Sequence, residues 1–354
     1  MIRVQTLPCI LVSRFVLLFF FALSAVTYAG PPSGPRSAKL VNLSTVPLIK
    51  AREVVVTGNV AWVAQNLDGM TAVDISRPGK PRIVKSFGSD RIQPLGLTTI
   101  APSHLIIADR FRGLVIWDVK HADRPTSLSC IGLPGIASHV AVGTIGKRRI
   151  AAVACAGEGL TVVDITDMKT PRVVGRFTMR IDYSRRVFLD GNLCYLADHF
   201  DGGLKVVDLS VPENPMPIFQ IAMKGFCESV GLNKSLLTVG YRNYGIRYFD
   251  VQRHFRSDSA MDRQSTPTIS HLCTVSRSNT RVRTMDFVPG KFLAIANDES
   301  GIELYDLADR SRPLLAAEYT FTNPSQSAQS VLFHKGLLLV PAWDGGLYIF
   351  RVET

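Results

Sequence analysis

Short hydrophobic runs alternate with polar turns along nearly the whole chain. One unit shows the arrangement, with apolar runs at 95–100, 105–108, 114–119 and 126–131 and with turn-forming residues between them. β-Branched and aromatic residues dominate the runs, as in strands, and Gly, Asn, Asp and Pro dominate the turns. After residue 30, no stretch of a dozen residues has the apolar spacing of a helix. The pattern therefore predicts an all-β chain.

The third strand of each unit follows a glycine, and in six of seven copies it ends in aspartate. The copies read GMTAVDI, GLVIWDV, GLTVVDI, GLKVVDL, GIRYFDV, GIELYDL and GLYIFRV, starting at Gly69, Gly113, Gly159, Gly203, Gly245, Gly301 and Gly346. A period of about 40–45 residues with several short strands is typical of propeller blades. The repeat predicts a seven-bladed β-propeller of four-stranded antiparallel blades.

The third strand and its aspartate resemble the LVIVD repeat family. The segments GLTVVDITDMKTP at Gly159 and GLKVVDLSVPENP at Gly203 come close to the family pattern GLxVVDISDPxxP, and the resemblance extends over about residues 39–352. It implies a β-propeller of a kind found mainly in bacterial exported and surface proteins, and for most members no defined activity. Two repeats depart from the pattern: Arg351 replaces the aspartate of blade 7, and blade 5 carries an insertion at about 254–269.

The last unit supplies only three strands before the sequence ends, at 329–333, 336–340 and 347–352. An apolar segment at 39–46 precedes the first inner strand and has no partner within its own unit. We expect 39–46 to become the outermost strand of blade 7, which closes the ring and covers an otherwise exposed sheet edge.

The first 29 residues have the order of a secretory signal peptide. Arg3 and Arg14 precede an apolar run at 15–26, and small residues lie near Ala29. We expect cleavage near Ala29, a secreted or periplasmic protein, and a single propeller domain over 30–354. The alternative is an uncleaved amino-terminal membrane anchor, although the run is shorter than the ~20 residues of a spanning helix.

Charge and cysteine content refine this picture. The chain has 40 basic and 29 acidic residues, and removal of residues 1–29 takes away two arginines, which leaves 38 against 29. A basic exported protein suits an envelope protein or an anionic ligand as partner, and the charge equally suits plain solubility. No nucleic-acid partner is expected, and no membrane span remains after cleavage. The five remaining cysteines have no spacing typical of a disulfide framework.

Function is expected on loops rather than on the repeated residues. Six aspartates in equivalent places serve the fold, because a carboxylate before a turn accepts backbone N–H groups. The columns that differ between blades lie where the inner strands begin, at the mouth of the central channel. The candidates there are Arg52, Arg185, Arg283, Glu228 and His139, with His199 beside them and Arg110, Arg112 and Arg242 around them.

These arginines have two interpretations. Guanidinium groups suit bidentate binding of a carboxylate or phosphate, so the mouth is a candidate anion site. A ring of solvated or mutually paired charges has the same sequence pattern. The aromatic residues Tyr241, Tyr244 and Trp343, together with Phe111 and Phe200, are candidates for a protein-binding rim. Trp343 and Phe200 equally suit plugs of the core between blades.

No catalytic signature is found: no GxSxG, HExxH, P-loop or GxGxxG motif is present. We therefore expect a non-enzymatic binding module without a cofactor, acting through its basic, aromatic-bearing rim at the cell envelope. The alternative is a metal-dependent, lactonase-like hydrolase at the channel mouth. Its candidate ligands are His139 and His199 with Asp198 or Glu228.

Overall fold

The structure is a computed structural model that describes residues 34, 36–100, 102–178, 184–199, 203–222, 225–252, 267–277, 280–323 and 325–354. Two compact units are present, Met1–Gly34 and Pro35–Thr354, and every described strand belongs to the second. The predicted signal peptide and most of the blade 5 insertion lie outside the described residues. No helix among those residues is long and apolar enough to cross a membrane.

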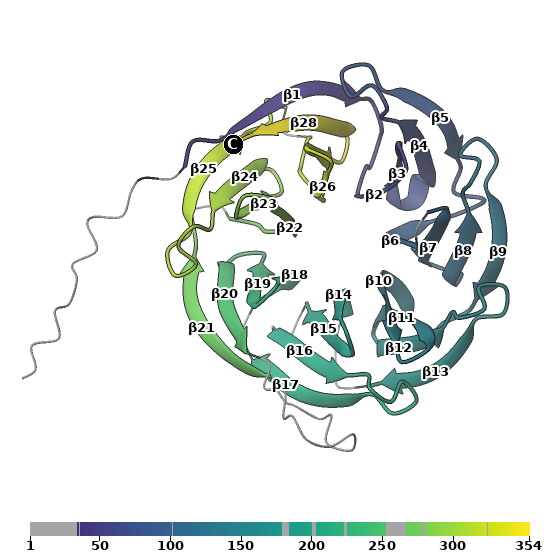
Figure 1. Cartoon of the computed structure of the whole chain (residues 1–354). Helices are drawn as coiled ribbons and strands as arrows, with labels where there is room; N and C mark the ends of the chain where they lie inside the picture. Colours follow the sequence, from purple (N-terminus) through teal and green to yellow (C-terminus); the bar gives the residue numbers. More distant parts are fainter. Residues whose placement is uncertain are drawn as a thin grey trace, which may run out of the picture. The chain divides into compact units, whose positions relative to one another are not determined.

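Within Pro35–Thr354, the described strands form seven four-stranded antiparallel sheets that stand as blades around a ring (Figure 1). Blade 1 contains β2 (Glu53–Thr57), β3 (Val60–Ala64), β4 (Met70–Asp74) and β5 (Arg82–Phe87). Blade 2 contains β6 (Pro94–Ile100), β7 (His104–Asp109), β8 (Gly113–Asp118) and β9 (Thr126–Ile131). Blade 3 contains β10 (Ile136–Ile145), β11 (Arg148–Ala156), β12 (Gly159–Asp164) and β13 (Arg172–Phe177).

The remaining blades follow in chain order. Blade 4 contains β14 (Ser184–Asp190), β15 (Leu193–Asp198), β16 (Gly203–Asp208) and β17 (Met216–Ala222). Blade 5 contains β18 (Cys227–Asn233), β19 (Leu236–Tyr241), β20 (Gly245–Gln252) and β21 (Thr268–Val275). Blade 6 contains β22 (Thr284–Val288), β23 (Phe292–Ala296), β24 (Ile302–Asp306) and β25 (Leu314–Tyr319). Blade 7 contains β26 (Leu332–His334), β27 (Leu337–Pro341), β28 (Leu347–Glu353) and β1 (Lys39–Val46).

Blade 7 closes the ring as the sequence predicts. β1 pairs antiparallel with β28 from Lys39 opposite Glu353 to Val46 opposite Leu347, and Figure 1 shows β1 as the outermost strand beside it. Arg36, shortly before β1, is also held in place, because its Nη2 donates to Asp306 Oδ1 at 2.6 Å on blade 6. The Arg36 guanidinium lies 4.4 Å from the centre of the Phe292 ring. The predicted seven-bladed fold and its closure are both confirmed.

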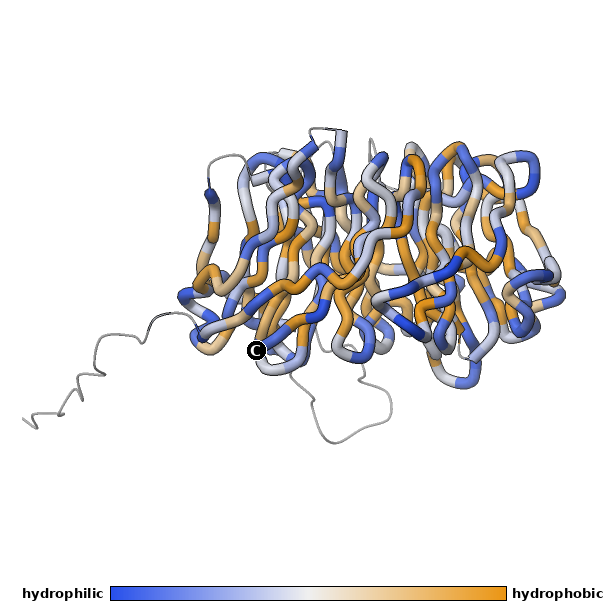
Figure 2. Tube along the Cα trace, turned by 90° about the horizontal axis from the view of Figure 1, so that it is seen from above, coloured by the Kyte–Doolittle hydropathy of each residue, from blue (hydrophilic) through white to orange (hydrophobic). Residues whose placement is uncertain are grey.

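The core lies between neighbouring blades rather than inside any one of them. Between blades 1 and 2, the rings of Trp62, Phe87 and Trp117 pack at centroid distances of 6.3 and 5.5 Å. Viewed from the side, the strands are mostly hydrophobic along their length and the loops at both ends are hydrophilic (Figure 2). Each blade therefore buries its apolar surface only against its neighbours, as in other repeat architectures.

The recurrent aspartate holds the turn that follows the third strand. In five blades its Oδ1 atom accepts the backbone N–H two residues further on, at 2.8–2.9 Å, and these are Asp74, Asp118, Asp164, Asp208 and Asp306. At Asp250 and Arg351 the strand continues, to Gln252 and to Glu353. The aspartate is a turn-forming residue, in agreement with the sequence prediction.

The glycine before each third strand has a positive φ, between 78° and 150°. At Gly301 an added Cβ would lie 2.0 Å from the carbonyl oxygen of Tyr319 on the neighbouring strand. Both the backbone conformation and the close approach therefore require glycine there.

Replacement of Asp118 tests the turn. Asp118→Ala removes the acceptor for the Lys120 N–H and should lower the free energy of unfolding by about 1 kcal/mol. Asp118→Asn keeps an oxygen acceptor and should lose much less. Denaturant unfolding of both variants measures the difference, and equal losses would contradict a turn-fixing hydrogen bond.

Candidate functional site at the channel mouth

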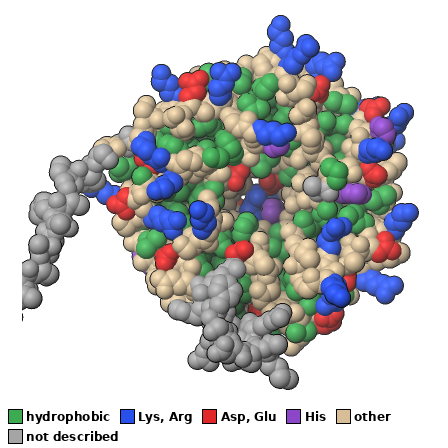
Figure 3. All heavy atoms as spheres, viewed as in Figure 1, with side chains coloured by type: hydrophobic (Ala, Val, Ile, Leu, Met, Phe, Trp, Pro, Cys, Tyr) green, Lys and Arg blue, Asp and Glu red, His purple; other side chains and the backbone are tan. Residues whose placement is uncertain are grey.

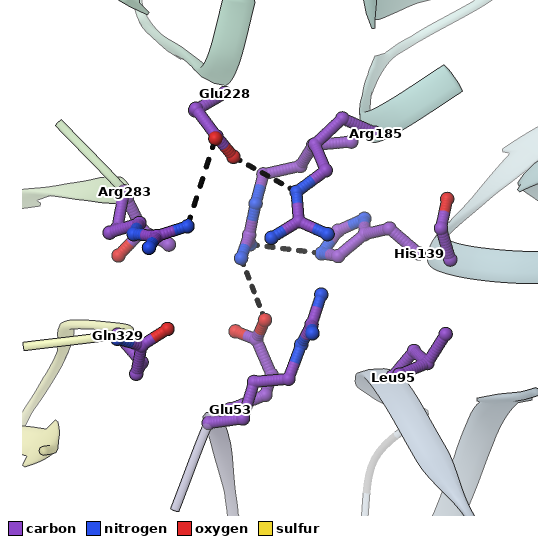
Figure 4. A pocket seen from close by; sticks show the side chains of 11 residues that line it. Glu53, Leu95, His139, Arg185, Glu228, Arg283 and Gln329 are labelled. Carbon is purple, nitrogen blue, oxygen red and sulfur yellow. Dashed lines mark hydrogen bonds and ion pairs between the residues drawn. The ribbon is translucent and has the colours of Figure 1, made fainter. Parts of the chain in front are cut away.

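The first residues of the inner strands meet in a small pocket at the mouth of the central channel. Figure 3 shows a hollow at the centre of the ring with basic and histidine side chains inside it, and Figure 4 shows the pocket from close by. The pocket encloses about 20 Å³ of free space. Its lining residues are Arg52, Glu53, Leu95, Ser138, His139, Arg185, Arg186, Glu228, Arg283, Thr284 and Gln329.

In blades 3 and 4, consecutive residues line this pocket because the inner strands bulge. Side chains of neighbouring residues in a regular strand point to opposite faces. The pairing with the second strand skips one residue in blades 2 to 5, and the skipped residues are Leu95, Ser138, Arg185 and Glu228. A bulge of this kind redirects side chains. It allows Arg185 and Arg186, or Ser138 and His139, to line the same pocket.

Glu53 and Arg186 form a charge pair across the ring. Arg186 Nη2 donates to Glu53 Oε2 at 2.7 Å, and the Ser330 hydroxyl donates to Glu53 Oε1 at 3.0 Å. Arg186 Nη1 lies 3.0 Å from His139 Nε2. Because arginine only donates, and the Val187 N–H also points to His139 Nδ1 at 3.4 Å, these contacts suit a neutral imidazole and not an imidazolium, which has a proton on both nitrogens. Burial and then the charges of Arg186, Arg185 and Arg52 lower the pKa of His139 well below its ordinary value.

Glu228 is the second carboxylate of the pocket and is 1% exposed. Arg185 Nε donates to its Oε2 at 2.9 Å (Figure 4). Its Oε1 lies 3.5 Å from His199 Nδ1 and 3.8 Å from Arg283 Nη1. Burial raises the pKa of Glu228, but the charges of Arg185, of His199 in its protonated form and of Arg283 outweigh burial, so the pKa lies below its ordinary value. The carboxylate therefore remains ionised at neutral pH.

Arg283 also binds a carboxylate behind the pocket. Its Nε and Nη2 atoms lie 3.1 and 2.9 Å from Asp298 Oδ2, and Arg242 Nη2 lies 4.0 Å from the same oxygen. Asp298 is 4% exposed and has a φ of 49°, in the loop between β23 and β24. Burial is the largest influence on His199 too, and it lowers the pKa of that imidazole. His199 is therefore a neutral neighbour of Glu228.

The structure brings together five of the predicted candidates, Arg52, His139, Arg185, Glu228 and Arg283, and places His199 in contact with them. Arg110, Arg112 and Arg242 do not line the pocket. Arg110 Nη2 donates to Asn66 Oδ1 at 3.2 Å, and Arg112 Nη2 donates to the Asp90 carbonyl at 2.9 Å, so both stabilise rim loops.

The structure corrects one aromatic candidate. Tyr241 is the last residue of β19 and is fully buried in the core between blades 4 and 5, because its neighbour blade covers the strand end. It does not present its ring on the rim. Tyr244 is 50% exposed, and Trp343 is half-buried with its backbone paired to Ala51. Phe200 lies outside the described residues.

Glu53 and Arg186 are the two principal pocket residues that the candidates from sequence omit. Glu53 directly follows the candidate Arg52, and Arg186 directly follows the candidate Arg185. Both therefore lie one sequence position from a predicted residue. The metal hypothesis draws no support from the geometry, since His139 and His199 have different partners. Across the described ranges, no group of three or more His, Cys, Asp or Glu side chains is placed to hold a metal ion.

Ring and repeat together define the class of this protein, a seven-bladed β-propeller with a charged channel mouth. Sequence comparison adds that the LVIVD repeat matches residues 50–88, 150–179 and 182–222, so this propeller contains LVIVD repeats. No curated protein sequence matches it.

Two solved structures have a similar fold. The β-propeller domain of Myceliophteria thermophila Cps50 (Swd1) aligns with a TM-score of 0.68 at 14% identity, over 89% of this chain and 100% of that one. The computationally designed Ika8 protein aligns with a TM-score of 0.61 at 12% identity, over 88% and 99%. At these identities the likeness concerns the fold alone.

We expect the loss of one partner of the Glu53–Arg186 pair to destabilise the fold much more than the loss of both partners together. Arg186→Leu leaves the carboxylate of Glu53, 6% exposed, without its guanidinium and should cost about 3–5 kcal/mol of unfolding free energy. Glu53→Leu/Arg186→Leu should recover most of that loss. Denaturant unfolding of the single and double variants measures the coupling, and additive losses would contradict it.

Asp286 links blades 6 and 7 beneath the pocket. Its Oδ2 accepts the Phe333 N–H at 2.7 Å and its Oδ1 accepts the Phe287 N–H at 2.9 Å. Burial nevertheless raises the pKa of Asp286 to about 6. Because the folded pKa lies above the unfolded one, protonation favours the folded state. The resulting stability is fully present below about pH 4 and is lost as the pH rises through 6.

This predicts a pH-dependent difference between the wild type and Asp286→Asn. The unfolding free energy of the wild type, minus that of the variant, should fall by about 3 kcal/mol between pH 4 and pH 7. Other titrating groups are common to both proteins and cancel. Urea unfolding at several pH values measures the difference, and a constant value would show that Asp286 does not titrate in this range.

Proposed function

We propose that this propeller is a non-enzymatic interaction module that binds a protein partner at the cell envelope. The binding surface is the mouth face, which consists of the loops between the second and third strands and the loops that lead into the inner strands. Both sets lie on one face because the start of each inner strand pairs with the end of the second strand, as Glu53 does with Ala64. The composition of residues 1–29 supports the envelope location.

One observation carries the proposal: exposed hydrophobic side chains gather on the mouth face. Of the seven large hydrophobic residues that are exposed in the described part of the chain, four lie on its loops. They are Ile49 at 57%, Leu67 at 45%, Phe111 at 74% and Tyr244 at 50%. Exposed apolar groups rimmed by polar residues mark interaction sites.

Three of them lie on loops that hydrogen bonds connect, and we name these three residues the apolar patch (Ile49, Leu67 and Phe111). Gln65 Nε2 donates to the Ile49 carbonyl at 3.0 Å, and Arg110 connects the Phe111 loop to Asn66 beside Leu67. The three loops are thus hydrogen-bonded to one another across blades 1 and 2.

Phe111 is held in place rather than left on a loose loop. The buried carboxylate of Asp109 accepts the N–H groups of Phe111 and Arg112 at 3.0 and 2.8 Å, which fixes the loop tip. An aromatic group on a rigid loop loses little entropy on binding. The flanking Arg110 and Arg112 add the residue type that most often accompanies aromatic groups in binding hot spots.

Removal of the apolar patch tests this proposal. The Leu67→Ser/Phe111→Ser variant, immobilised beside the wild type, should lose envelope proteins captured from the producing cells, with affinity reduced about tenfold or more. The control is Ile83→Ser/Met216→Ser, which changes two similarly exposed residues on outer strands, at 48% and 44%. Capture that is equal for the patch variant and the wild type would refute the proposal.

A further inference from the structure

The channel-mouth pocket carries more positive charge than its own carboxylates neutralise. Among the described residues, its lining has four arginines and two glutamates, a surplus of two positive charges within this lining. Arg242 and Asp298 behind Arg283 carry opposite charges and leave the surplus unchanged. His139 adds no charge of its own, since neighbouring arginine charges and burial keep its imidazole neutral.

The two glutamates are already engaged. Glu53 receives Arg186 and Ser330, and Glu228 receives Arg185 with Arg283 and His199 at longer distance. Arg185 contacts Glu228 through Nε, whereas a guanidinium has five N–H donors. Figure 4 shows this guanidinium extending from its blade toward the middle of the pocket, with its terminal nitrogens beyond the bond to Glu228.

The surplus positive charge lies on side chains that are mostly buried. The side chains of Arg185, Arg186 and Arg283 are only 19%, 19% and 16% exposed. Attraction to an anion is stronger in such a place than in bulk water, and so is the mutual repulsion of the arginines that an anion relieves. Ion pairs with Glu228, Glu53 and Asp298 hold these side chains in place, so little ordering is needed on binding.

We propose that the pocket is a subsite for one oxyanion group, a carboxylate or a phosphate, bound by Arg185 with Arg52 and Arg283. This deepens the proposed function, on which it rests for the choice of binding face. Forked guanidinium groups match the oxygens of both anions. A free volume of about 20 Å³ admits about one water-sized group, so one oxygen atom of an oxyanion that approaches from solvent can enter it, whereas a whole organic cofactor cannot.

Anion titration of the full chain tests the subsite directly. Phosphate and acetate are added separately against sodium chloride at constant ionic strength, and binding is followed by calorimetry and by the thermal midpoint. The wild type should show saturable binding of at least one of the two, and the two arms distinguish phosphate from carboxylate recognition. No response beyond that of chloride would overturn the subsite.

Leu95 provides a matched pair of variants, because its side chain lines the same pocket. Leu95→Glu places a carboxylate in the site and should abolish the anion response, whereas Leu95→Gln should keep it. Arg185→Gln/Glu228→Gln removes a charge pair together, so no buried charge is left alone, and should weaken binding about tenfold or more. Arg172→Gln, on an outer strand, should bind as the wild type does.

Two outcomes would overturn the assignment to these residues: a full response in Leu95→Glu, or unchanged affinity in Arg185→Gln/Glu228→Gln. The tests of the two proposals fail separately. Oxyanion binding without patch-dependent protein capture would refute the interaction module alone, and capture without oxyanion binding would refute the subsite alone.

Discussion

The pairing of β1 with β28 is the contact on which the rest of the molecule depends. Each blade buries its apolar surface against two neighbours, so an open ring would leave two blades with an uncovered face and one sheet with an unpaired edge. Residues 39–46 close both gaps at once. The bonds of Arg36 to Asp306 hold this segment against blade 6, so blades 6 and 7 share the closure.

Closure also sets the electrostatics of the channel. Seven inner strands begin on one face and bring their first side chains within reach of one another, whichever blades they come from. Arg186 of blade 4 and Glu53 of blade 1 pair although 133 residues separate them. Such a pair exists only in the closed ring, because no single blade or pair of neighbouring blades contains both partners. The charged mouth and the ring are therefore mutually dependent.

The repeat period of the sequence predicted the fold, whereas the sequence predicted the site only in part. A spacing of 42–46 residues between most repeats and an unpartnered apolar segment at 39–46 were enough for blade number and closure. Aligned inner strands brought Arg52, Arg185, Glu228 and Arg283 to one column. Glu53 and Arg186 lie one position further along the same strands and were not among the candidates. For Arg186 the reason is the bulge at Arg185, which depends on pairing with the next strand and cannot be read from the sequence. β2 pairs without a bulge, so this reason does not apply to Glu53. The prediction that Tyr241 lies on the rim was wrong for a related reason. The neighbouring blade buries this residue, and the sequence of its own repeat does not show that burial.

The two parts of the mouth face differ in how freely they can change. Loss of one pocket arginine leaves a buried glutamate unpaired, a cost of several kcal/mol in most proteins, so the fold itself constrains the pocket. The residues of the apolar patch are exposed, and replacement of such residues usually changes stability by less than about 0.5 kcal/mol. A propeller of this construction keeps a fixed cluster of charges at its centre, while the loops around it can vary without loss of the ring. In the proposed complex, charge at the centre would chiefly set which groups are admitted, and apolar contacts at the rim would chiefly set how long they stay.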